Sequence, residues 1–556
     1  MEERGMATAR DGTMEWWKTE EFTVYCRGVL GTCPAKDATE LTPIDMHPLP
    51  RQAVLAWAFV YESRIDEGRF REALATVLVD YPVLAGRFSS GNVVSHNNTG
   101  VRVVVGKGTR RSSALSGTLV LETEEASSKP SYVNPMDLKR VYKGKDPVLS
   151  FRLTHLLDGG TVLGVTVPHA LVDGRSLAQV LAALSLQYQG EPYAKPFTDR
   201  RVLTYQPLAD LCTRDEIDSF HAPLGGGGDA ADDGLPSSLL RDAKLSTAAS
   251  LAAATSKLQS GRRVHPQGPL GGQGGSPSGG HESAPPSSPP PSSSSTTTLG
   301  TWGSVRYLFK LLWEVVKGGK LATVVVKICP EQMGEIKERQ AAQARAEGRA
   351  ERISKNDIAV AYAWILMRKL QQRLGHLRGT DRENRSRMLF AADLRARNRV
   401  ENLNERYFGN AAVAVEISAE PEMSLAECAL AVRGAVSGLD GGGKSKGIMD
   451  LVWGVSQETS IAKTLPALVT SLPCYHDCFV TSWQFPFQDL DFGLAKPPAS
   501  VFPGMFPRCP WTAIVLGDAE GAAYVHLCLP SRARDVLRTD PSVHAGTLDR
   551  ASVIKP

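Results

Sequence analysis

The clearest feature of the hydrophobic pattern is a short apolar run followed directly by an amphipathic segment. Residues 161–167 are mostly apolar and rich in β-branched side chains, which is typical of a buried strand. Pro168 ends this strand and His169 follows it. Leucine and valine then recur at helical spacing, so the sequence predicts a helix that begins near Ser176 and buries one face.

The same kind of pattern predicts strands and helices along most of the remaining chain. Expected strands cover residues 54–61, 101–105, 148–157, 322–328, 388–392, 411–417, 479–483, 514–516 and 523–529. Expected helices cover residues 70–79, 330–349, 354–374 and 424–439. Residues 1–40 give no clear element.

One long segment has a composition that cannot form a core. Residues 223–303 are dominated by glycine, serine, proline and alanine, and they include runs of four glycines and of serines with prolines. Such a segment buries too little apolar surface to offset its ordering entropy. We expect a disordered insert or linker here.

Charge and cysteine usage exclude several classes of protein. The chain has 63 basic and 59 acidic residues, and this small excess does not favour a nucleic-acid partner. Its nine cysteines are odd in number and scattered, as in reduced cytosolic proteins. Cys474 and Cys478 could form half of a metal site, but no second pair has suitable spacing, so we expect no metal. We see no secretory leader or membrane span, and we expect a cytoplasmic protein.

The residues after the central strand carry the candidate chemistry. His169 is followed by Asp173 and Gly174, and this spacing suits a histidine base whose ring is held by a turn. Asp173 is a good cap for the next helix, and Gly174 allows backbone angles that a Cβ would oppose. A zinc-binding pair would need histidine at position 173. From these residues alone, a histidine satisfied within a loop is an equally good interpretation.

A second motif is a decoy. Residues 438–445 match the phosphate-binding pattern G-x-x-x-x-G-K-[ST]. That loop requires a preceding strand and a following helix, so that its amides face the phosphates. Here a predicted helix comes first, so nucleotide hydrolysis is not favoured.

Several motifs taken together resemble the BAHD acyltransferases, CoA-dependent enzymes defined by HxxxDG and DFGWG. This chain has HALVDG at 169–174 and DFG at 491–493. LTPID, YPVLAGRF, ISKNDIAVAYAW, ADLRAR, RYFGN and TSW resemble other family signatures and occur in the family's order. The resemblance covers nearly the whole chain apart from the insert.

The resemblance implies an α/β fold of two chloramphenicol-acetyltransferase-like domains. Each would be a mixed β-sheet flanked by helices, with the active-site channel between them. We therefore expect an N-terminal domain at 1–222, the insert at 223–303 and a C-terminal domain at 304–556. The family is usually monomeric.

The resemblance also implies a reaction and roles for individual residues. His169 would act as general base while an alcohol or amine attacks an acyl-CoA thioester, with acyl-CoA as co-substrate and no permanent cofactor. Asp173 would be structural and paired with Arg395 or Arg397. Ser354 and Lys355 would contact a CoA phosphate. The structural motifs would comprise Asp173, Gly174, Arg395, Arg397, Asp491, Phe492 and Gly493, with Asp491 holding its loop through an ion pair.

The sequence departs from the family pattern in three places. Leu494 and Ala495 replace the tryptophan and last glycine of DFGWG, which would remove an indole donor near the channel. Ala411 stands where malonyl-transferring members have cysteine, so malonyl transfer is not favoured. Phe485 stands where members that esterify shikimate or quinate carry arginine, which favours a neutral alcohol or amine acceptor.

Two functions therefore compete. The first is an active acyl-CoA-dependent O- or N-acyltransferase. The second is a degenerate member that binds CoA or a partner without turnover, as the altered DFG segment and the insert would allow. A carnitine-type acyltransferase is a third and weaker interpretation. The sequence does not identify the acyl group or the acceptor.

Overall fold

The structure is a computed structural model that describes most of the chain on either side of the expected insert. The described residues are 17–27, 37–115, 132–204, 321–346, 348, 352–375, 386–395, 400, 402–420, 423–438, 478–503, 509–518, 520–543 and 552–554. The expected insert at 223–303 and the second candidate arginine, Arg397, lie outside them.

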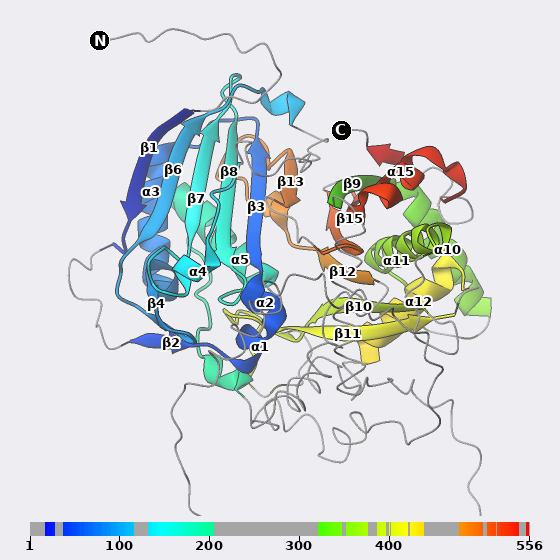
Figure 1. Ribbon diagram of the computed structural model, residues 1–556. Coiled ribbons are helices and arrows are strands. Elements are labelled where there is room, and N and C mark those ends of the chain that lie inside the picture. The colour runs from blue at the N-terminus through cyan, green and yellow to red at the C-terminus, as the bar shows by residue number, and fades with distance from the viewer. Residues whose placement is uncertain are drawn as a thin grey trace, which may run out of the picture. The chain divides into compact units, whose positions relative to one another are not determined.

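The first sheet has six strands in the order β1-β6-β7-β8-β3-β13. It is mixed, because β6 and β7 are parallel whereas the other neighbours are antiparallel. Two long helices that pack on each other, α3 (Glu67–Asp80) and α5 (Gly174–Gln189), cover one face (Figure 1). The strands are β1 (Trp17–Val24), β3 (Val54–Tyr61), β6 (Val101–Lys107), β7 (Ser150–His155), β8 (Thr161–Pro168) and β13 (Ser500–Pro503).

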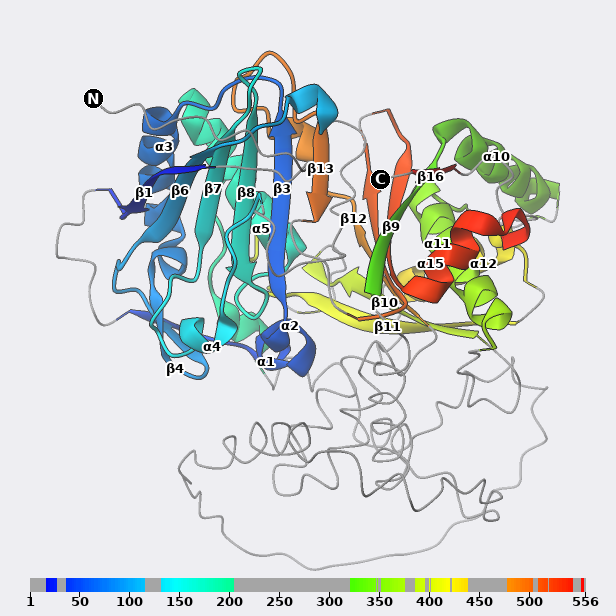
Figure 2. The same ribbon diagram turned by 45° about the horizontal axis from the view of Figure 1, so that its top comes forward.

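The second sheet has seven strands in the order β11-β10-β12-β14-β15-β9-β16. It is also mixed, with β10, β12 and β14 parallel to one another. The strands are β9 (Leu321–Ile328), β10 (Ser386–Asp393), β11 (Ala412–Ala419), β12 (Cys478–Trp483), β14 (Thr512–Gly517), β15 (Ala523–Pro530) and β16 (Ser552–Ile554). The helices beside it are α10 (Pro330–Ala346), α11 (Lys355–Arg373), α12 (Leu425–Gly438) and α15 (Ser531–Thr539), as Figure 2 shows.

Short elements complete the described chain. Three strands form a small sheet in the order β2-β5-β4. These strands and the short helices are β2 (Ala38–Glu40), β4 (Arg87–Ser90), β5 (Val93–Ser95), α1 (Pro43–Met46), α2 (Pro48–Gln52) and α4 (Leu138–Val141).

The central prediction, a strand that leads into an amphipathic helix, is confirmed. β8 is buried along its whole length and pairs with β7 on one side and β3 on the other. α5 begins at Gly174, two residues earlier than predicted, because Asp173 caps it by accepting a hydrogen bond from the Ser176 amide. Every other strand and helix predicted above has a counterpart, with bounds shifted by a few residues.

The structure also contains elements that the pattern did not predict: the strands β1, β2, β4, β5, β13 and β16, and the helices α1, α2, α4 and α15. β1 is an edge strand paired only with β6, and its sequence WKTEEFTV carries many polar residues. An edge strand needs less apolar surface than a central one, so its pattern is weak. The other missed strands have three or four residues, too few to show a period.

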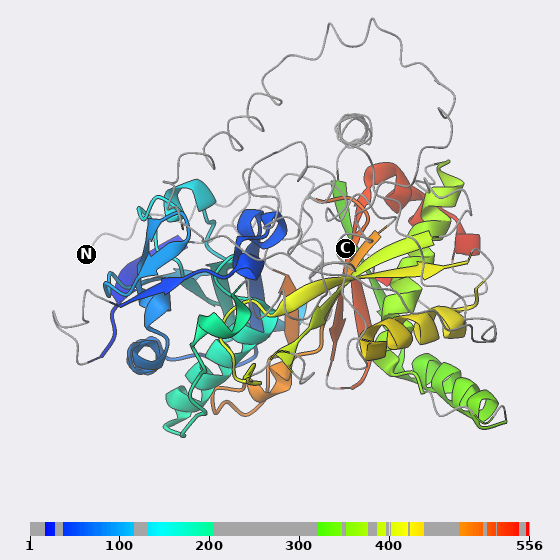
Figure 3. The ribbon, with the colours of Figure 1, turned by 90° about the horizontal axis from the view of Figure 1, so that it is seen from below.

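The two halves of the chain are interlocked. β13 lies more than 300 residues after β3 in the sequence, yet the two strands pair antiparallel in the first sheet. Phe408, Trp483, Phe487 and Phe492 also join the first hydrophobic core. In addition, β10 and β11 extend from the second sheet toward α1 and α2 (Figures 1 and 3).

A pair of glycine substitutions tests the packing of the central strand. A Cβ added to Gly164 in β8 would lie 2.0 Å from the Tyr132 carbonyl oxygen, so Gly164→Ala must push two backbones apart. We expect a loss of about 1–3 kcal/mol or more in the free energy of unfolding. The matched control is Gly434→Ala in α12, where a Cβ meets no atom within 4 Å, and this helix should gain about 0.5–1 kcal/mol. Urea unfolding measures both changes, and an unchanged Gly164→Ala protein would contradict the tight approach.

Candidate active site

His169 is held at the end of β8 by the neighbouring strand and by the turn that follows. Its amide donates a hydrogen bond of 3.0 Å to the Ala53 carbonyl, just before β3 begins. Four residues later the Asp173 carboxylate caps α5. The chain between these two points is therefore fixed at both ends.

Asp173 also forms a buried, bidentate ion pair with Arg395. Arg395 Nη1 lies 2.8 Å from Asp173 Oδ2, and Nη2 lies 3.0 Å from Oδ1. The amides of Ser176 and Ala411 donate to the same carboxylate at 2.9 Å. Of the two arginines proposed from the sequence, Arg395 makes the pair. Asp173 has its acceptor positions filled by the protein, so its part here is structural.

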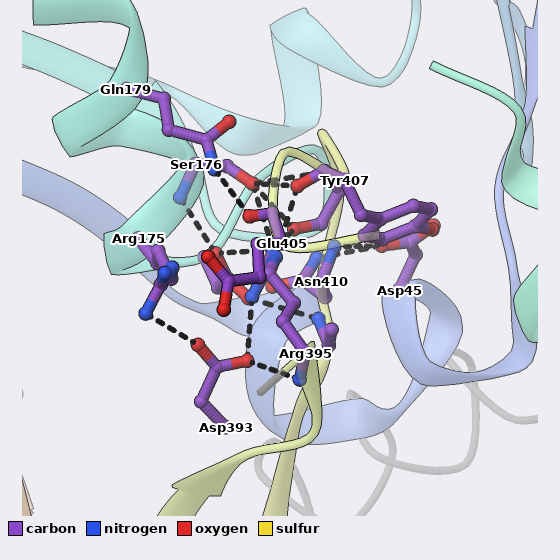
Figure 4. Close-up of polar contacts among 12 residues, drawn as sticks. Asp45, Arg175, Ser176, Gln179, Asp393, Arg395, Glu405, Tyr407 and Asn410 are labelled. Atoms are coloured by element: carbon purple, nitrogen blue, oxygen red, sulfur yellow. Dashed lines mark hydrogen bonds and ion pairs between the residues drawn. The ribbon is translucent and has the colours of Figure 1, made fainter. Parts of the chain in front are cut away.

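The guanidinium of Arg395 connects this carboxylate to the loop before β11. It donates to the carbonyl oxygens of Tyr407 and Gly409 and to Ser176 Oγ, at 2.8–3.0 Å. It also contacts the carboxylate of Asp393 at 2.9 Å. Figure 4 shows these contacts converging on Arg395. Each part of the buried cation has a partner, as a charge removed from water requires.

Asp173 and Arg395 each stabilise the charged form of the other. Burial alone would raise the pKa of Asp173, but Arg395 and the two amides outweigh it and hold the pKa below its ordinary value. Burial alone would lower the pKa of Arg395, but Asp173 and Asp393 raise it above its ordinary value. Both groups are therefore charged across the physiological pH range.

The side chain that contacts the His169 ring is Asn410. Its Oδ1 lies 3.1 Å from His169 Nδ1. Its amide nitrogen donates to Asp45 Oδ1 at 2.7 Å and to the His169 carbonyl at 2.9 Å. Asp45 is buried, and its amide donates to the side chain of Thr42, the N-cap of α1. Its carboxylate forms an ion pair with Arg200 at 2.5 Å. Arg200 in turn donates to the Leu171 carbonyl at 2.6 Å.

These contacts determine which imidazole nitrogen carries the proton. The two acceptors around Asn410 Nδ2, a carboxylate and a carbonyl, fix the orientation of the amide, so Oδ1 faces the histidine. An amide oxygen can only accept, and therefore His169 Nδ1 must donate. In the neutral ring, Nε2 then carries the lone pair. This is the tautomer that a general base needs.

Burial lowers the pKa of His169 below its ordinary value, although its own backbone, Asp173, Asn410 and Asp45 act in the opposite direction. The residue as a whole is half-buried. A neutral and oriented imidazole can accept a proton at physiological pH.

The DFG segment lies at the other end of α5. Asp491 Oδ1 accepts hydrogen bonds from Gln189 Nε2 at 3.0 Å and from the Gly493 amide at 2.8 Å. Phe492 donates its amide to Ser185 Oγ, and its buried ring packs on Tyr61 and Tyr188. Phe492 and Gly493 both have left-handed backbone angles, with φ of 53° and 64°. The motif is a tightly fixed turn.

Hydrogen bonds hold the Asp491 carboxylate within the described chain, where no cation lies within ion-pair distance of it. The ion pair expected for Asp491 stays a prediction. Ser185, which anchors the turn, lies twelve residues beyond Asp173, about 18 Å along a helix. Leu494 and Ala495 follow this turn.

The two residues predicted to contact CoA make other contacts in the structure. Ser354 caps α11, and its hydroxyl and amide both interact with Asp357. Lys355 lies beside Gly521: its Nζ is 3.2 Å from the point where a Cβ would stand if this glycine were another residue. Among the hydrogen bonds of the described residues, none joins Ser354 or Lys355 to His169 or Asp173.

The structure describes only some of the residues in the phosphate-binding pattern at 438–445 and in the cysteine pair at 474 and 478. α12 ends at Gly438, so a helix does precede the glycine-rich segment, whose residues 439–445 lie outside the described chain. Cys478 is buried in β12, whereas Cys474 is not described. The described residues include no group of three or more histidine, cysteine, aspartate or glutamate side chains that could hold a metal. Nor is any helix among them long and apolar enough to cross a membrane.

Sequence reasoning missed part of the polar network. Asn410 and Asp45 stand within the motifs RYFGN and LTPID, but the sequence pattern assigns neither a role. Nothing in the sequence pattern indicates a polar contact for Ser176 or Arg200. Their importance comes from contacts with segments more than 150 residues away.

Aromatic side chains from both halves of the chain meet beside Gly174. A Cβ on Gly174 would lie 2.8 Å from the Phe485 ring and 3.4 Å from Trp57. The Trp57 ring lies 5.5 Å from Phe485 and 5.2 Å from Trp483, measured between centroids. Phe485 therefore belongs to an aromatic wall, defined here as Trp57, Trp483 and Phe485, at the start of α5.

Comparison with known sequences adds family information to this geometry. The sequence model described as the Transferase family matches residues 40–223 and 315–542. Tryptamine hydroxycinnamoyltransferase 2 of Oryza sativa subsp. japonica is 31% identical over 160 residues, which are 27% of this chain and 34% of that protein. Hydroxycinnamoyl-CoA:5-hydroxyanthranilate N-hydroxycinnamoyltransferase HHT1 of Avena sativa is 30% identical over 151 residues, 25% of this chain and 31% of that protein. The matched segments thus span about a third of each relative.

Solved structures support the fold. Vinorine synthase aligns with a TM-score of 0.56 and 16% identity, over 94% of this chain and 96% of its own. TRI101 of F. sporotrichioides, crystallised with coenzyme A and T-2, aligns with a TM-score of 0.55 and 14% identity, over 93% of this chain and 100% of its own. The predicted class, a two-domain α/β fold with mixed sheets, is confirmed.

Two carboxylate substitutions test the different environments of the two motifs. Asp173→Asn retains the cap but leaves Arg395 without its principal counter-charge, and we expect a loss of about 3–5 kcal/mol in the free energy of unfolding. The matched control is Asp491→Asn, which retains an acceptor and breaks no described ion pair, so we expect a loss below about 1 kcal/mol. Chemical denaturation compares the two. Equal losses would show that Asp491 makes a stronger contact than the hydrogen bonds seen in the described chain.

Proposed function

Because this chain belongs to the Transferase family, the BAHD acyltransferases, we propose that it transfers an acyl group from a CoA thioester to an alcohol or amine. The observation that carries the proposal is the Asn410 contact, which fixes His169 Nδ1 as a donor and leaves Nε2 as the base. Acyl-CoA is the co-substrate, and His169 is the catalytic residue.

The proposed reaction needs one proton acceptor and no covalent enzyme intermediate. His169 Nε2 takes the proton from the acceptor hydroxyl or amine as its oxygen or nitrogen attacks the thioester carbonyl. The carbon–sulfur bond breaks, and the CoA thiolate leaves with the proton that His169 has gained. Both substrates are held together, so their orientation contributes to the rate. The low pKa of His169 keeps the base unprotonated before each turnover.

The acceptor is proposed to be an aromatic amine or alcohol that carries no carboxylate. Phe485, within the aromatic wall beside Gly174, offers no charge to a carboxylate, but its ring can pack against another ring. The two curated relatives are named for tryptamine and for 5-hydroxyanthranilate. Of these two, tryptamine lacks a carboxylate and fits the wall better. Their names also favour a hydroxycinnamoyl group as the acyl donor.

The competing interpretation, binding without turnover, is less favoured. It rests on Leu494 and Ala495, which stand in for two residues of DFGWG, and on the insert at 223–303, which lies outside the described residues. The turn that they follow is anchored near Ser185, about 18 Å along α5 from Asp173. The contacts of His169 and Asn410 do not include these positions, so the base can function without them.

The test is release of the CoA thiol by the purified full-length protein. Acetyl-CoA, a long-chain acyl-CoA and a hydroxycinnamoyl-CoA are each combined with tryptamine, 5-hydroxyanthranilate, alcohols and hydroxy acids. His169→Ala should lower kcat/KM at least about a hundredfold, as loss of a general base does. The matched control is His96→Ala, because His96 contacts Thr39 and, among the described residues, no hydrogen bond joins its ring to His169, Asn410 or Asp45, although the charge of Arg200 acts on it.

Each outcome decides between the interpretations. Thiol release that requires both substrates and His169 supports the proposal. Full activity of a folded His169→Ala protein contradicts the assignment of the base. If CoA binds, as calorimetry would detect, and no pair of substrates releases thiol, the protein is a non-catalytic member of its family.

Phe485→Arg tests the proposed acceptor. An arginine at this position would offer a bidentate partner to a carboxylate and remove one ring of the aromatic wall. We expect kcat/KM for acidic acceptors relative to tryptamine to rise about tenfold or more. Phe485→Leu is the control, because it removes the ring without adding charge. The proposal fails if wild-type protein already prefers acidic acceptors.

A further inference from the structure

A pocket lies outside the candidate active site, between α11, the start of α12 and the end of β11. Its volume is about 130 Å³, and it is partly open to solvent. α11 and α12 lie side by side in Figures 1 and 2. For comparison, an apolar protein cavity of about 150 Å³ is large enough for benzene. The pocket can therefore hold a ligand about as large as one aromatic ring.

The walls of this pocket are chemically divided. Trp364, Met423 and Leu425 contribute apolar surface. Arg368 and Lys369, adjacent on α11, contribute two cations. An apolar floor beside cations suits a compact apolar body that carries a negative charge.

Arg368 lines this space and holds one backbone contact beside it. Its Nη1 donates to the Glu420 carbonyl at 3.1 Å, and among the described residues no carboxylate forms an ion pair with it. Burial raises the pKa of Cys428, on the α12 side of the pocket, to about 11; Arg368 acts in the opposite direction and Glu427 in the same direction as burial. A guanidinium has five N–H donors, so it can bind a carboxylate while retaining its carbonyl contact.

The start of α12 also lines the pocket, but it offers no free donor. The Glu427 carboxylate accepts hydrogen bonds from the Ser424 amide and hydroxyl, both at 2.7 Å, so the protein itself caps this end of the helix. The preference for an anion therefore rests on the two cations of α11.

We propose that this pocket binds a small organic anion, a carboxylate on a compact aromatic or short aliphatic body. The site is separate from the His169 network. Asn410 lies just before β11, whereas Ala419 at the pocket is the last residue of that strand, about 23 Å away along it. This proposal does not depend on the proposed transferase activity.

The test uses benzoate as the probe, with benzyl alcohol and benzylammonium as ligands of similar shape and different charge. Binding to the full-length protein is measured by isothermal titration. For so few atoms we expect millimolar affinity for benzoate. Benzyl alcohol should bind at least about tenfold more weakly, and benzylammonium should not bind.

Substitutions and a local chemical readout locate the site. Arg368→Gln should weaken benzoate binding about ten- to a hundredfold. Arg339→Gln, an exposed position on α10, is the matched control and should leave binding unchanged. In wild-type protein, benzoate should slow alkylation of Cys428 but not of Cys528, which is buried in β15. Mass spectrometry of the two peptides measures both rates.

Three results would overturn the proposal. The first is no benzoate binding in the millimolar range. The second is equal affinity for benzoate and benzyl alcohol, which would assign no part to the cations. The third is binding that leaves Cys428 alkylation unchanged, which would place the ligand elsewhere. The comparison of ligands uses wild-type protein, so it holds even if Arg368→Gln does not fold.

Discussion

The buried ion pair between Asp173 and Arg395 is the constraint on which the rest of the site depends. Its two residues lie 222 positions apart, and both are almost fully covered. A buried charge without a partner is costly, so the start of α5 and the end of β10 have one acceptable relative position. Ser176 and the carbonyls of Tyr407 and Gly409 complete the arrangement. The contact between His169 and Asn410 follows, because His169 lies shortly before Asp173 and Asn410 is next to Ala411, whose amide donates to the Asp173 carboxylate.

The polar chain from Arg200 through Asp45 and Asn410 to His169 sets the tautomer and the charge environment of the imidazole. The carboxylate of Asp45 does not contact the imidazole directly, because the Asn410 amide lies between them. An amide fixes the tautomer without placing a full negative charge beside the ring. Burial can therefore hold the pKa of His169 below its ordinary value. The His169 imidazole is therefore held neutral and oriented, as its proposed role of base requires.

The two sequence motifs have separate physical tasks on one helix. The histidine motif delivers the candidate base at the start of α5, and the DFG turn is anchored near its end. A buried ring, a serine contact and left-handed backbone angles stabilise the turn. None of these contacts needs the side chain of residue 494 or 495. Departure from a family motif at these positions is therefore compatible with an intact candidate site.

The sequence by itself determined the local arrangement around His169. A β-branched run forms a strand, a proline ends it, and Asp173 caps the helix that follows, since each effect acts within a few residues. Tertiary structure alone decided that Arg395 pairs with Asp173, that Asn410 contacts His169, and that β13 joins the first sheet. These contacts join residues more than 200 positions apart. Hydrophobic periodicity and capping carry no information about such distances, because they describe only neighbours along the chain.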